Sequence, residues 1–240
     1  MTKTQSKKQT MKPNTQNNKI ILCWCDNGTV DGKFAEGLIY SVLSSPLPIA
    51  SAMRVQGNQI GRQRQQAMEF WYKETNFDWI LWVDSDIVLT NEALEKVWRS
   101  VDSVNRPVVS GTYFVSKENE QSLMAPYPAL FNFVDGEEFK MAYVHPLPKD
   151  ALIPVNSAGF GFLLMHRSAI KKMLKVHGDK PFFNETGVGD KFVSEDINFF
   201  KLMYEAGVPL FAHTGAVVKH MKRFAFDLEF YKLFWNNGRP

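Results

Sequence analysis

The apolar segment of residues 77–89, FDWILWVDSDIVL, constrains the fold more than any other stretch of the chain. It is rich in aromatic and β-branched residues, and it carries Asp84 and Asp86 with only Ser85 between them. This composition predicts a buried strand that ends at the aspartates. Two desolvated carboxylates this close repel each other and need a cation or strong hydrogen-bond donors. The alternative is that Asp84 only caps a helix that begins near Thr90, with Asp86 on the surface.

Strands and helices alternate along the chain on both sides of this segment. Strands are expected at residues 20–25, 49–55, 79–83, 107–114, 155–165, 209–211 and 216–220. Helices are expected at residues 33–43, 58–73, 91–101, 168–176 and 194–206, and a hairpin or meander at residues 127–144. This alternation predicts an α/β domain with a mostly parallel sheet, whose ligands gather at the carboxyl ends of the strands.

The charge of the chain is unevenly distributed. It carries 28 Lys and Arg against 25 Asp and Glu, a formal net charge of +3. The first 19 residues contain no acid and five lysines, namely Lys3, Lys7, Lys8, Lys12 and Lys19. The remainder has 23 basic against 25 acidic residues, which argues against a stable complex with nucleic acid. We expect a disordered polar and basic tail at residues 1–18, one domain at residues 19–222, and an aromatic C-terminal segment at residues 223–240 that packs on it.

Cysteine content and hydropathy bear on the cellular setting. The only cysteines are Cys23 and Cys25, which we expect unpaired and on opposite faces of one strand. Their small number fits a reducing environment. No apolar run approaches the roughly 18 residues that a membrane helix needs. A cytoplasmic protein, free or peripheral to a membrane, is therefore expected, and the oligomeric state has no signature in the sequence.

Four segments, in this order, resemble the GT-A nucleotide-sugar glycosyltransferases, in particular the broad family 2-like group. They are an arginine-rich helix start at residues 58–67, VDSDI at 83–87, NSAGFGFLLMHRSAI at 156–170, and SEDINFFKLMYEAGVPL at 194–210 with a later strand ending in His220. The resemblance spans roughly residues 20–222. It implies a GT-A (Rossmann-like) fold: a mostly parallel central sheet flanked by helices, with a small antiparallel sub-sheet on the acceptor side.

The resemblance implies that Asp84 and Asp86 form the DxD motif of that family, with Asp86 the main metal contact and Ser85 beside the donor. His220 matches a third ligand found at the end of a late strand. A divalent ion at such a site neutralises charge on the departing diphosphate. Oxygen ligands favour Mg²⁺ or Mn²⁺, and a histidine nitrogen tilts the choice towards Mn²⁺. The alternative for His220 is an exposed histidine with no role.

Glu195 and Asp196 resemble the family's ED motif, which begins a helix beneath the acceptor site. In inverting members the second acid is the general base, so the resemblance implies that Asp196 takes the proton of the acceptor hydroxyl. A partly buried carboxylate can be tuned for this task. The alternative is that Ser194 is an N-cap and that both acids favour the positive end of the helix. Retaining relatives use similar scaffolds without such a base.

The resemblance also assigns donor-binding residues near the start of the chain. Arg62 and Arg64 lie where the family carries an arginine for the diphosphate, although the usual Arg-Asn pattern is Arg64-Gln65 here and leaves the choice of arginine open. Bidentate pairing to phosphate favours arginine, and a solvated basic helix face is the alternative. Asp26 and Asn27 follow the first strand, from which this fold reads the base and ribose. An ordinary Asx turn is the alternative there.

Further donor contacts are implied later in the chain. Asn156, Gly159 and Gly161 resemble the segment that borders the donor sugar, where glycines on one strand face leave room for a ligand. The alternative is that the glycines serve packing. Lys222 could reach the diphosphate when the following segment closes over the donor. Aromatic residues at 230–235 either stack on sugar rings or form the buried stripe of a helix.

These features predict a metal-dependent glycosyltransferase that moves a sugar from a nucleotide-diphosphate donor to the hydroxyl of a glycan or other acceptor. One rival is a nucleotidyltransferase on a related fold, and another is a carbohydrate-binding GT-A scaffold without catalytic activity. Nucleotidyltransferases usually open with a glycine-rich, basic loop after the first strand. Residues 26–31 of this chain read DNGTVD, which is acidic and poor in glycine. Base, sugar and acceptor have no signature in the sequence.

Overall fold

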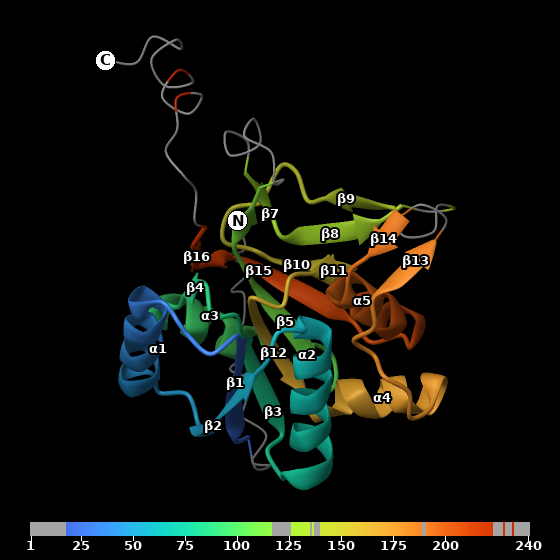
Figure 1. Ribbon diagram of the computed structural model, residues 1–240, viewed down its shortest axis with the longest axis horizontal. Helices are drawn as coiled ribbons and strands as arrows, with labels where there is room; N and C mark the ends of the chain where they lie inside the picture. Colours follow the sequence, from blue (N-terminus) through green and yellow to red (C-terminus); the bar gives the residue numbers. More distant parts are fainter. Residues whose placement is uncertain are drawn as a thin grey trace, which may run out of the picture.

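The computed structural model describes residues 18–116, 126–134, 136, 140–188, 191–222, 228 and 232. A central sheet separates two layers of helices (Figure 1). Helices α1 (Gly32–Ser44) and α3 (Asn91–Ser100) pack on one face of the sheet. Helices α2 (Ile60–Glu69), α4 (Arg167–His177) and α5 (Glu195–Glu205) pack on the other. A π-helical turn, Phe70–Glu74, extends α2. The helices thus bury both faces of the sheet.

Seven strands form the central sheet, in the order β10-β15-β5-β12-β3-β1-β2. Their bounds are β1 (Ile20–Asp26), β2 (Ile49–Gln56), β3 (Trp79–Val83), β5 (Val108–Thr112), β10 (Leu152–Val155), β12 (Phe162–His166) and β15 (Leu210–Val217). Strands β1, β2, β3, β5 and β15 run in one direction, and β12 and β10 run against them. The expected α/β fold with a mostly parallel central sheet and flanking helices is confirmed.

Strand β3 lies inside this sheet between β1 and β12, and both of its faces are covered. Ile80 and Trp82 point into the core beneath α2, α4 and α5, whereas Trp79, Leu81 and Val83 point into the core beneath α1 and α3. A strand buried on both faces needs an uninterrupted apolar sequence. This requirement explains WILWV and delivers Asp84 and Asp86 at its carboxyl end.

The shorter strands pair outside the central sheet. Strands β8 (Leu130–Phe133), β9 (Met141–Tyr143) and β11 (Ser157–Ala158) form a three-stranded antiparallel sheet. Strand β6 (Phe114–Val115) pairs with β7 (Tyr127–Pro128), and β13 (Thr186–Val188) pairs with β14 (Lys191–Val193). Strand β4 (Ile87–Val88) pairs with β16 (Lys219–His220). The expected small antiparallel sheet is therefore present.

Three expectations about local structure were wrong. Residues 155–165 do not form one strand, because the chain leaves β10, pairs briefly as β11, turns at Gly159 to Gly161 and starts β12 in the central sheet. The strands expected at 209–211 and 216–220 are instead the eight-residue β15 followed by β16. Cys23 and Cys25 share one face of β1, since residues two apart in a strand lie on the same side.

Both cysteines are unpaired and buried, and burial raises the pKa of the Cys23 thiol. The tail at residues 1–17 lies outside the described residues, as do the aromatic residues at 230, 231, 234 and 235. No helix in the described part of the chain combines the length and apolar character that a bilayer crossing requires.

Candidate active site

Asp84, Ser85 and Asp86 form a tight turn between β3 and β4 at the carboxyl edge of the sheet. The Asp84 amide donates to the Gly161 carbonyl at 3.1 Å, and the Ile87 amide donates to the Asp84 carbonyl at 3.0 Å. These bonds fix the turn at both ends. The side chains of Asp84 and Asp86 keep 30% and 42% of their surface exposed, so both carboxylates are open to a ligand.

Strand β16 brings His220 to this turn from the far end of the chain. It pairs antiparallel with β4, so that His220 lies opposite Ile87, and the Met221 amide donates to the Asp86 carbonyl at 2.8 Å. His220 Nε2 lies 3.0 Å from Asp86 Oδ2, and Lys222 Nζ lies 3.6 Å from the same oxygen. Burial alone would raise the pKa of the Asp86 carboxyl, but His220 and Lys222 outweigh it and hold that pKa below its usual value.

The other side of the His220 ring is also held. Its Nδ1 lies 2.9 Å from the Phe114 carbonyl oxygen. A carbonyl oxygen only accepts, so Nδ1 carries a hydrogen and Nε2 faces the Asp86 carboxylate. The ring edge of Tyr113 packs against the imidazole with centroids 5.1 Å apart. His220 is therefore not a free surface histidine, and its Nε2 is aimed at the carboxylate of the turn.

Arg64 on α2 lies behind the turn and contacts two acids at once. Its Nη2 donates to Asp84 Oδ1 and Oδ2 at 2.9 and 3.0 Å, and its Nη1 donates to Glu195 Oε1 at 2.6 Å. The guanidinium also lies over the Phe160 ring, 4.9 Å from its centroid. Burial would lower the pKa of Arg64, but Asp84 and Glu195 raise it well above its usual value. Burial raises the pKa of the Glu195 carboxyl against the pull of Arg64.

The sequence left the choice between Arg62 and Arg64 open, and the two arginines have different surroundings. Arg64 is 5% exposed and faces Asp84 and Glu195, whereas Arg62 is exposed on the same helix. A phosphate group could meet the exposed Arg62 without displacing either carboxylate from Arg64. It could meet Arg64 only by competing with two carboxylates.

Asp196 occupies the first turn of α5, next to Glu195. Its Oδ1 accepts the Ile197 amide at 2.8 Å and the Ser194 hydroxyl. Its Oδ2 takes part in no hydrogen bond among the described residues. Ser194 occupies the N-cap position, but its hydroxyl holds Asp196 and does not cap the backbone. One carboxylate oxygen is thus fixed and the other is available.

Asp26, at the end of β1, is fully engaged inside the protein. Arg54 Nε and Nη2 donate to its two oxygens at 2.6 and 2.7 Å, the Gly28 amide donates at 2.7 Å, and Trp24 Nε1 donates at 3.1 Å. These four donors fill the four acceptor positions of a carboxylate. Hydrogen bonding by Arg54 lowers the pKa of Asp26 although burial opposes it. Asn27 is exposed beside it, where its amide Oδ1 lies 3.4 Å from the Thr29 hydroxyl.

Gly159 and Gly161 border Tyr113 closely. A Cβ at Gly159 would lie 1.7 Å from the Tyr113 hydroxyl oxygen, and a Cβ at Gly161 would lie 2.8 Å from its ring. The Gly161 amide donates to that hydroxyl at 3.2 Å. The space beside both glycines is therefore filled by a side chain of the protein.

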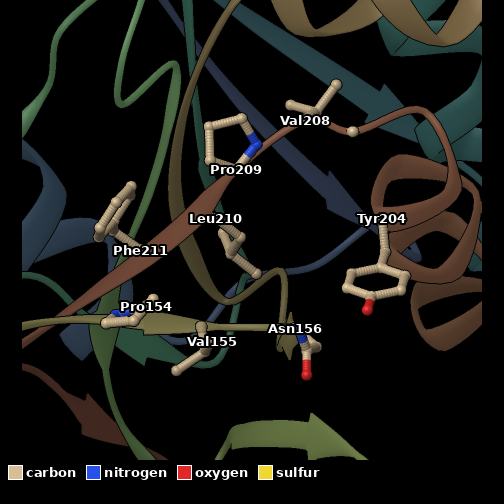
Figure 2. Close-up of a pocket in the computed structure, with 9 residues that line it drawn as sticks. Pro154, Val155, Asn156, Tyr204, Val208, Pro209, Leu210 and Phe211 are labelled. Atoms are coloured by element: carbon tan, nitrogen blue, oxygen red, sulfur yellow. The ribbon is translucent and has the colours of Figure 1, made fainter.

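Asn156 lies in a surface hollow between the start of β15 and the end of α5 (Figure 2). Its Oδ1 accepts the Phe133 amide at 3.0 Å, and Tyr204 stands across the hollow. The rest of the lining comes from residues 154–155 and 207–211. Among the described residues, no acid lines this hollow, and neither Asp84 nor Asp86 is part of its lining.

The described residues bring Asp84, Asp86, Glu195, Arg64, His220 and Lys222 into one cluster. Within that part of the chain, no three His, Cys, Asp or Glu side chains gather closely enough to hold a metal ion by themselves. Within this cluster, a carboxylate and an imidazole come into direct contact at Asp86 and His220. The sequence interpretation missed Tyr113 and Arg54. Both lie near the carboxyl ends of central strands, a position that could have marked them.

No protein-family model matches the sequence, and neither does any curated protein. Solved structures do resemble the fold. The crystal structure of A197 from STIV matches with a TM-score of 0.52 and 16% sequence identity, over 85% of this chain and 86% of that chain.

The crystal structure of GalNAc-T7 with UDP, GalNAc and Mn²⁺ matches with a TM-score of 0.51 and 8% identity, over 88% of this chain. The match spans 45% of the GalNAc-T7 chain. CMP:2-keto-3-deoxy-manno-octonic acid synthetase, complexed with CTP, is more distant, with a TM-score of 0.45. At such identities the two matches with TM-scores above 0.5 establish the fold alone, which is GT-A-like.

Proposed function

We propose that this protein is a glycosyltransferase that uses a divalent cation to transfer a sugar from a nucleoside-diphosphate donor to an acceptor hydroxyl. The observation that carries the proposal is the meeting of Asp86 and His220 at the carboxyl edge of a GT-A-like sheet, with Lys222 beside them. Ligands of open α/β sheets bind at this edge. The carboxylates and the cationic side chains gathered there suit the diphosphate of the donor and the reacting hydroxyl of the acceptor.

The donor atoms of Asp86 and His220 fit a divalent cation. Because the Phe114 carbonyl fixes the hydrogen of His220 on Nδ1, the lone pair of a neutral ring lies at Nε2. A lone pair aimed at an ionised carboxylate is unfavourable unless a proton or a metal ion lies between them. Mg²⁺-type sites are commonly completed by substrate phosphates in addition to one or two protein side chains. The pair would therefore hold Mn²⁺ or Mg²⁺ together with the donor.

The bound cation would supply charge neutralisation for the departing diphosphate. Lys222, 3.6 Å from Asp86 and half exposed, adds a positive charge that can face the same diphosphate. Arg62 is a second cation on the exposed face of α2. These side chains bind and orient the leaving group.

Asp196 would accept the proton of the acceptor hydroxyl as that oxygen attacks the anomeric carbon. The Ser194 hydroxyl and the Ile197 amide fix one oxygen of its carboxylate and leave Oδ2 to meet the acceptor. Attack by the acceptor oxygen from the side opposite the departing diphosphate, with its proton passing to Asp196, gives inversion at the anomeric carbon. Glu195 takes no proton in this scheme, since it is paired with Arg64.

A donor screen tests the proposal. The protein is incubated with Mn²⁺ and a panel of nucleotide sugars, and the released nucleoside diphosphate is identified. We expect release from one class of donor, and loss of release with chelator or with Asp86→Ala. Full activity of the Asp86→Ala variant in the presence of chelator would contradict the role of the cation.

Two other outcomes would favour the rival functions. Release of pyrophosphate from a nucleoside triphosphate and a sugar phosphate would identify a nucleotidyltransferase. Calorimetry that detects no nucleoside-diphosphate binding in Mn²⁺ would identify a scaffold without chemistry.

A further inference from the structure

Arg64 contacts both acidic pairs of the candidate site. Its Nη2 is bonded to Asp84, two residues before Asp86, and its Nη1 is bonded to Glu195, one residue before Asp196. Asp84 lies 20 residues after Arg64 in the chain and Glu195 lies 131 residues after it. One guanidinium therefore joins the turn after β3 to the first residue of α5.

The surroundings of Arg64 hold it in place. Its guanidinium rests on the Phe160 ring, and its side chain is 7% exposed. Gly61, one turn earlier in α2, lies so close to α5 that a Cβ there would be 2.9 Å from the Phe183 carbonyl oxygen and 3.2 Å from Glu195 Cβ. Helix α2 thus presses against the start of α5 with Arg64 at the contact.

The bonds of Arg64 separate it from ordinary phosphate ligands. A bound phosphate requires a guanidinium edge with free N–H groups. In Arg64 the edge formed by Nη1 and Nη2 is committed to two carboxylates, one of them on a buried glutamate. An arginine in this state is suited to holding other side chains rather than to releasing them for a substrate.

We infer that Arg64 is a positioning residue that sets the distance between the Asp84–Asp86 turn and Asp196 by binding Asp84 and Glu195 together. The inference rests on the proposed function, because it assigns the two joined elements to the donor and to the acceptor. A planar fork fixes both the distance and the orientation of its two partners, which a lysine cannot do. Losing that fork shifts the base relative to the donor without removing any group that touches either.

Arg64→Lys tests the inference, because it keeps the charge and removes the fork. We expect kcat for transfer to fall by about 100-fold, as for a misplacement of reacting groups by about 1 Å, with the donor KM little changed. The double variant Arg64→Lys with Glu195→Gln should lose no more than Arg64→Lys alone, because both act through one contact. If Arg64 only stabilised the fold, Arg64→Lys would lower thermal stability without lowering kcat while KM stays unchanged.

Arg167→Lys is the matched control. Arg167 also donates to two acceptors, the Tyr72 and Thr75 carbonyls, and lies 5.6 Å from an aromatic centroid, but it belongs to the opposite end of the sheet. Arg167→Lys should lower thermal stability without a selective loss of kcat. If Arg64→Lys does not fold, Glu195→Gln decides the question. Glutamine keeps the shape of the Glu195 side chain and weakens its hydrogen bond with Arg64.

The outcomes are distinct. A folded Arg64→Lys variant with wild-type kcat overturns the positioning role, and so does a loss confined to donor KM, which would make Arg64 a diphosphate ligand. The same readings apply to Glu195→Gln. If the wild-type protein turns over no nucleotide sugar, the proposed function fails and the positioning role fails with it. If the wild type is active and only the variant results disagree, the positioning role alone is wrong.

Discussion

His220 Nε2 lies 3.0 Å from Asp86 Oδ2, although the two residues are 134 positions apart in the chain. The contact depends on β4 and β16, two strands of two residues each. Such short strands gain little from their own hydrogen bonds, so the surrounding core must hold them. Ile87 is fully buried and Val218 is 3% exposed, and both belong to the core beneath α1 and α3. The fold therefore assembles this pair by packing the residues on either side of it.

If Asp86 and His220 share a cation, His220→Ala should weaken Mn²⁺ binding measured in the presence of a nucleoside diphosphate. We expect a loss of about 10- to 100-fold, the range found when the geometry of a metal site is disturbed. Electron paramagnetic resonance of Mn²⁺ gives the free and bound fractions directly. His145→Ala is the control, because His145 is an exposed histidine outside the cluster. Equal Mn²⁺ affinity in the wild type and His220→Ala would remove His220 from the site.

The strand and the helix that carry these acids could be predicted from the sequence because their signals are local. The apolar run before Asp84 predicts a buried strand, and Ser194-Glu195-Asp196 predicts a helix start. Thr90, next to the expected start of the helix, caps α3, because its hydroxyl oxygen accepts the Ala93 amide at 3.3 Å. Each of these predictions depends on residues a few positions apart, where side-chain periodicity and capping chemistry are decisive.

The partners of these groups could not be predicted in the same way. The bond from Arg64 to Glu195 and the pair of Asp26 with Arg54 join residues 131 and 28 positions apart. Their geometry is set by the order of the strands and the register of α2, which no single segment encodes. The glycines at 159 and 161 fit either room for a ligand or a packing role, and the sequence does not reveal that Tyr113 fills the space beside them.

Tyr113 gives Gly159 a packing role that can be measured. Gly159→Ala should lower the free energy of unfolding by about 1–3 kcal/mol, because its Cβ would overlap the Tyr113 hydroxyl oxygen. Tyr113→Phe removes that oxygen, so the double variant should lose less than the sum of the two single losses. Chemical denaturation measures all three, with Gly32→Ala as control, since a Cβ at Gly32 meets nothing within 4 Å. Unchanged stability with lost donor binding would instead indicate that Gly159 contacts the donor.

Asp196→Asn tests the general base. We expect kcat for transfer to fall by about 10²- to 10⁴-fold, because an amide cannot accept the proton, while donor affinity stays near that of the wild type. The Ser194 hydroxyl and the Ile197 amide can still bond to the Asn oxygen, so the helix start should remain intact. Single-turnover kinetics and calorimetry with the nucleoside diphosphate separate the two effects. A variant that transfers at the wild-type rate would show that another group takes the proton.

Asp26 and Arg54 should make stability depend on pH in the acid range. The pKa of Asp26 is lower in the folded protein than in the unfolded chain, where an aspartate titrates near about 3.9. Its contribution is therefore complete above that value and is lost as the pH falls through the lower, folded pKa. Asp26→Asn should reduce Tm at pH 7, and the difference from the wild type should shrink as the pH falls below about 4 towards the lower, folded pKa, at which the wild-type carboxylate becomes protonated. Thermal melts from neutral to acid pH measure this difference in Tm.

The hydrogen bonds from Arg54 are the largest cause of the lowered pKa of Asp26. Arg54→Gln should therefore reproduce most of the loss in Tm, and the double variant should lose little more than either single variant. A constant difference in Tm across the whole range would mean that the pair stabilises the carboxyl ends of β1 and β2 by packing and not by charge.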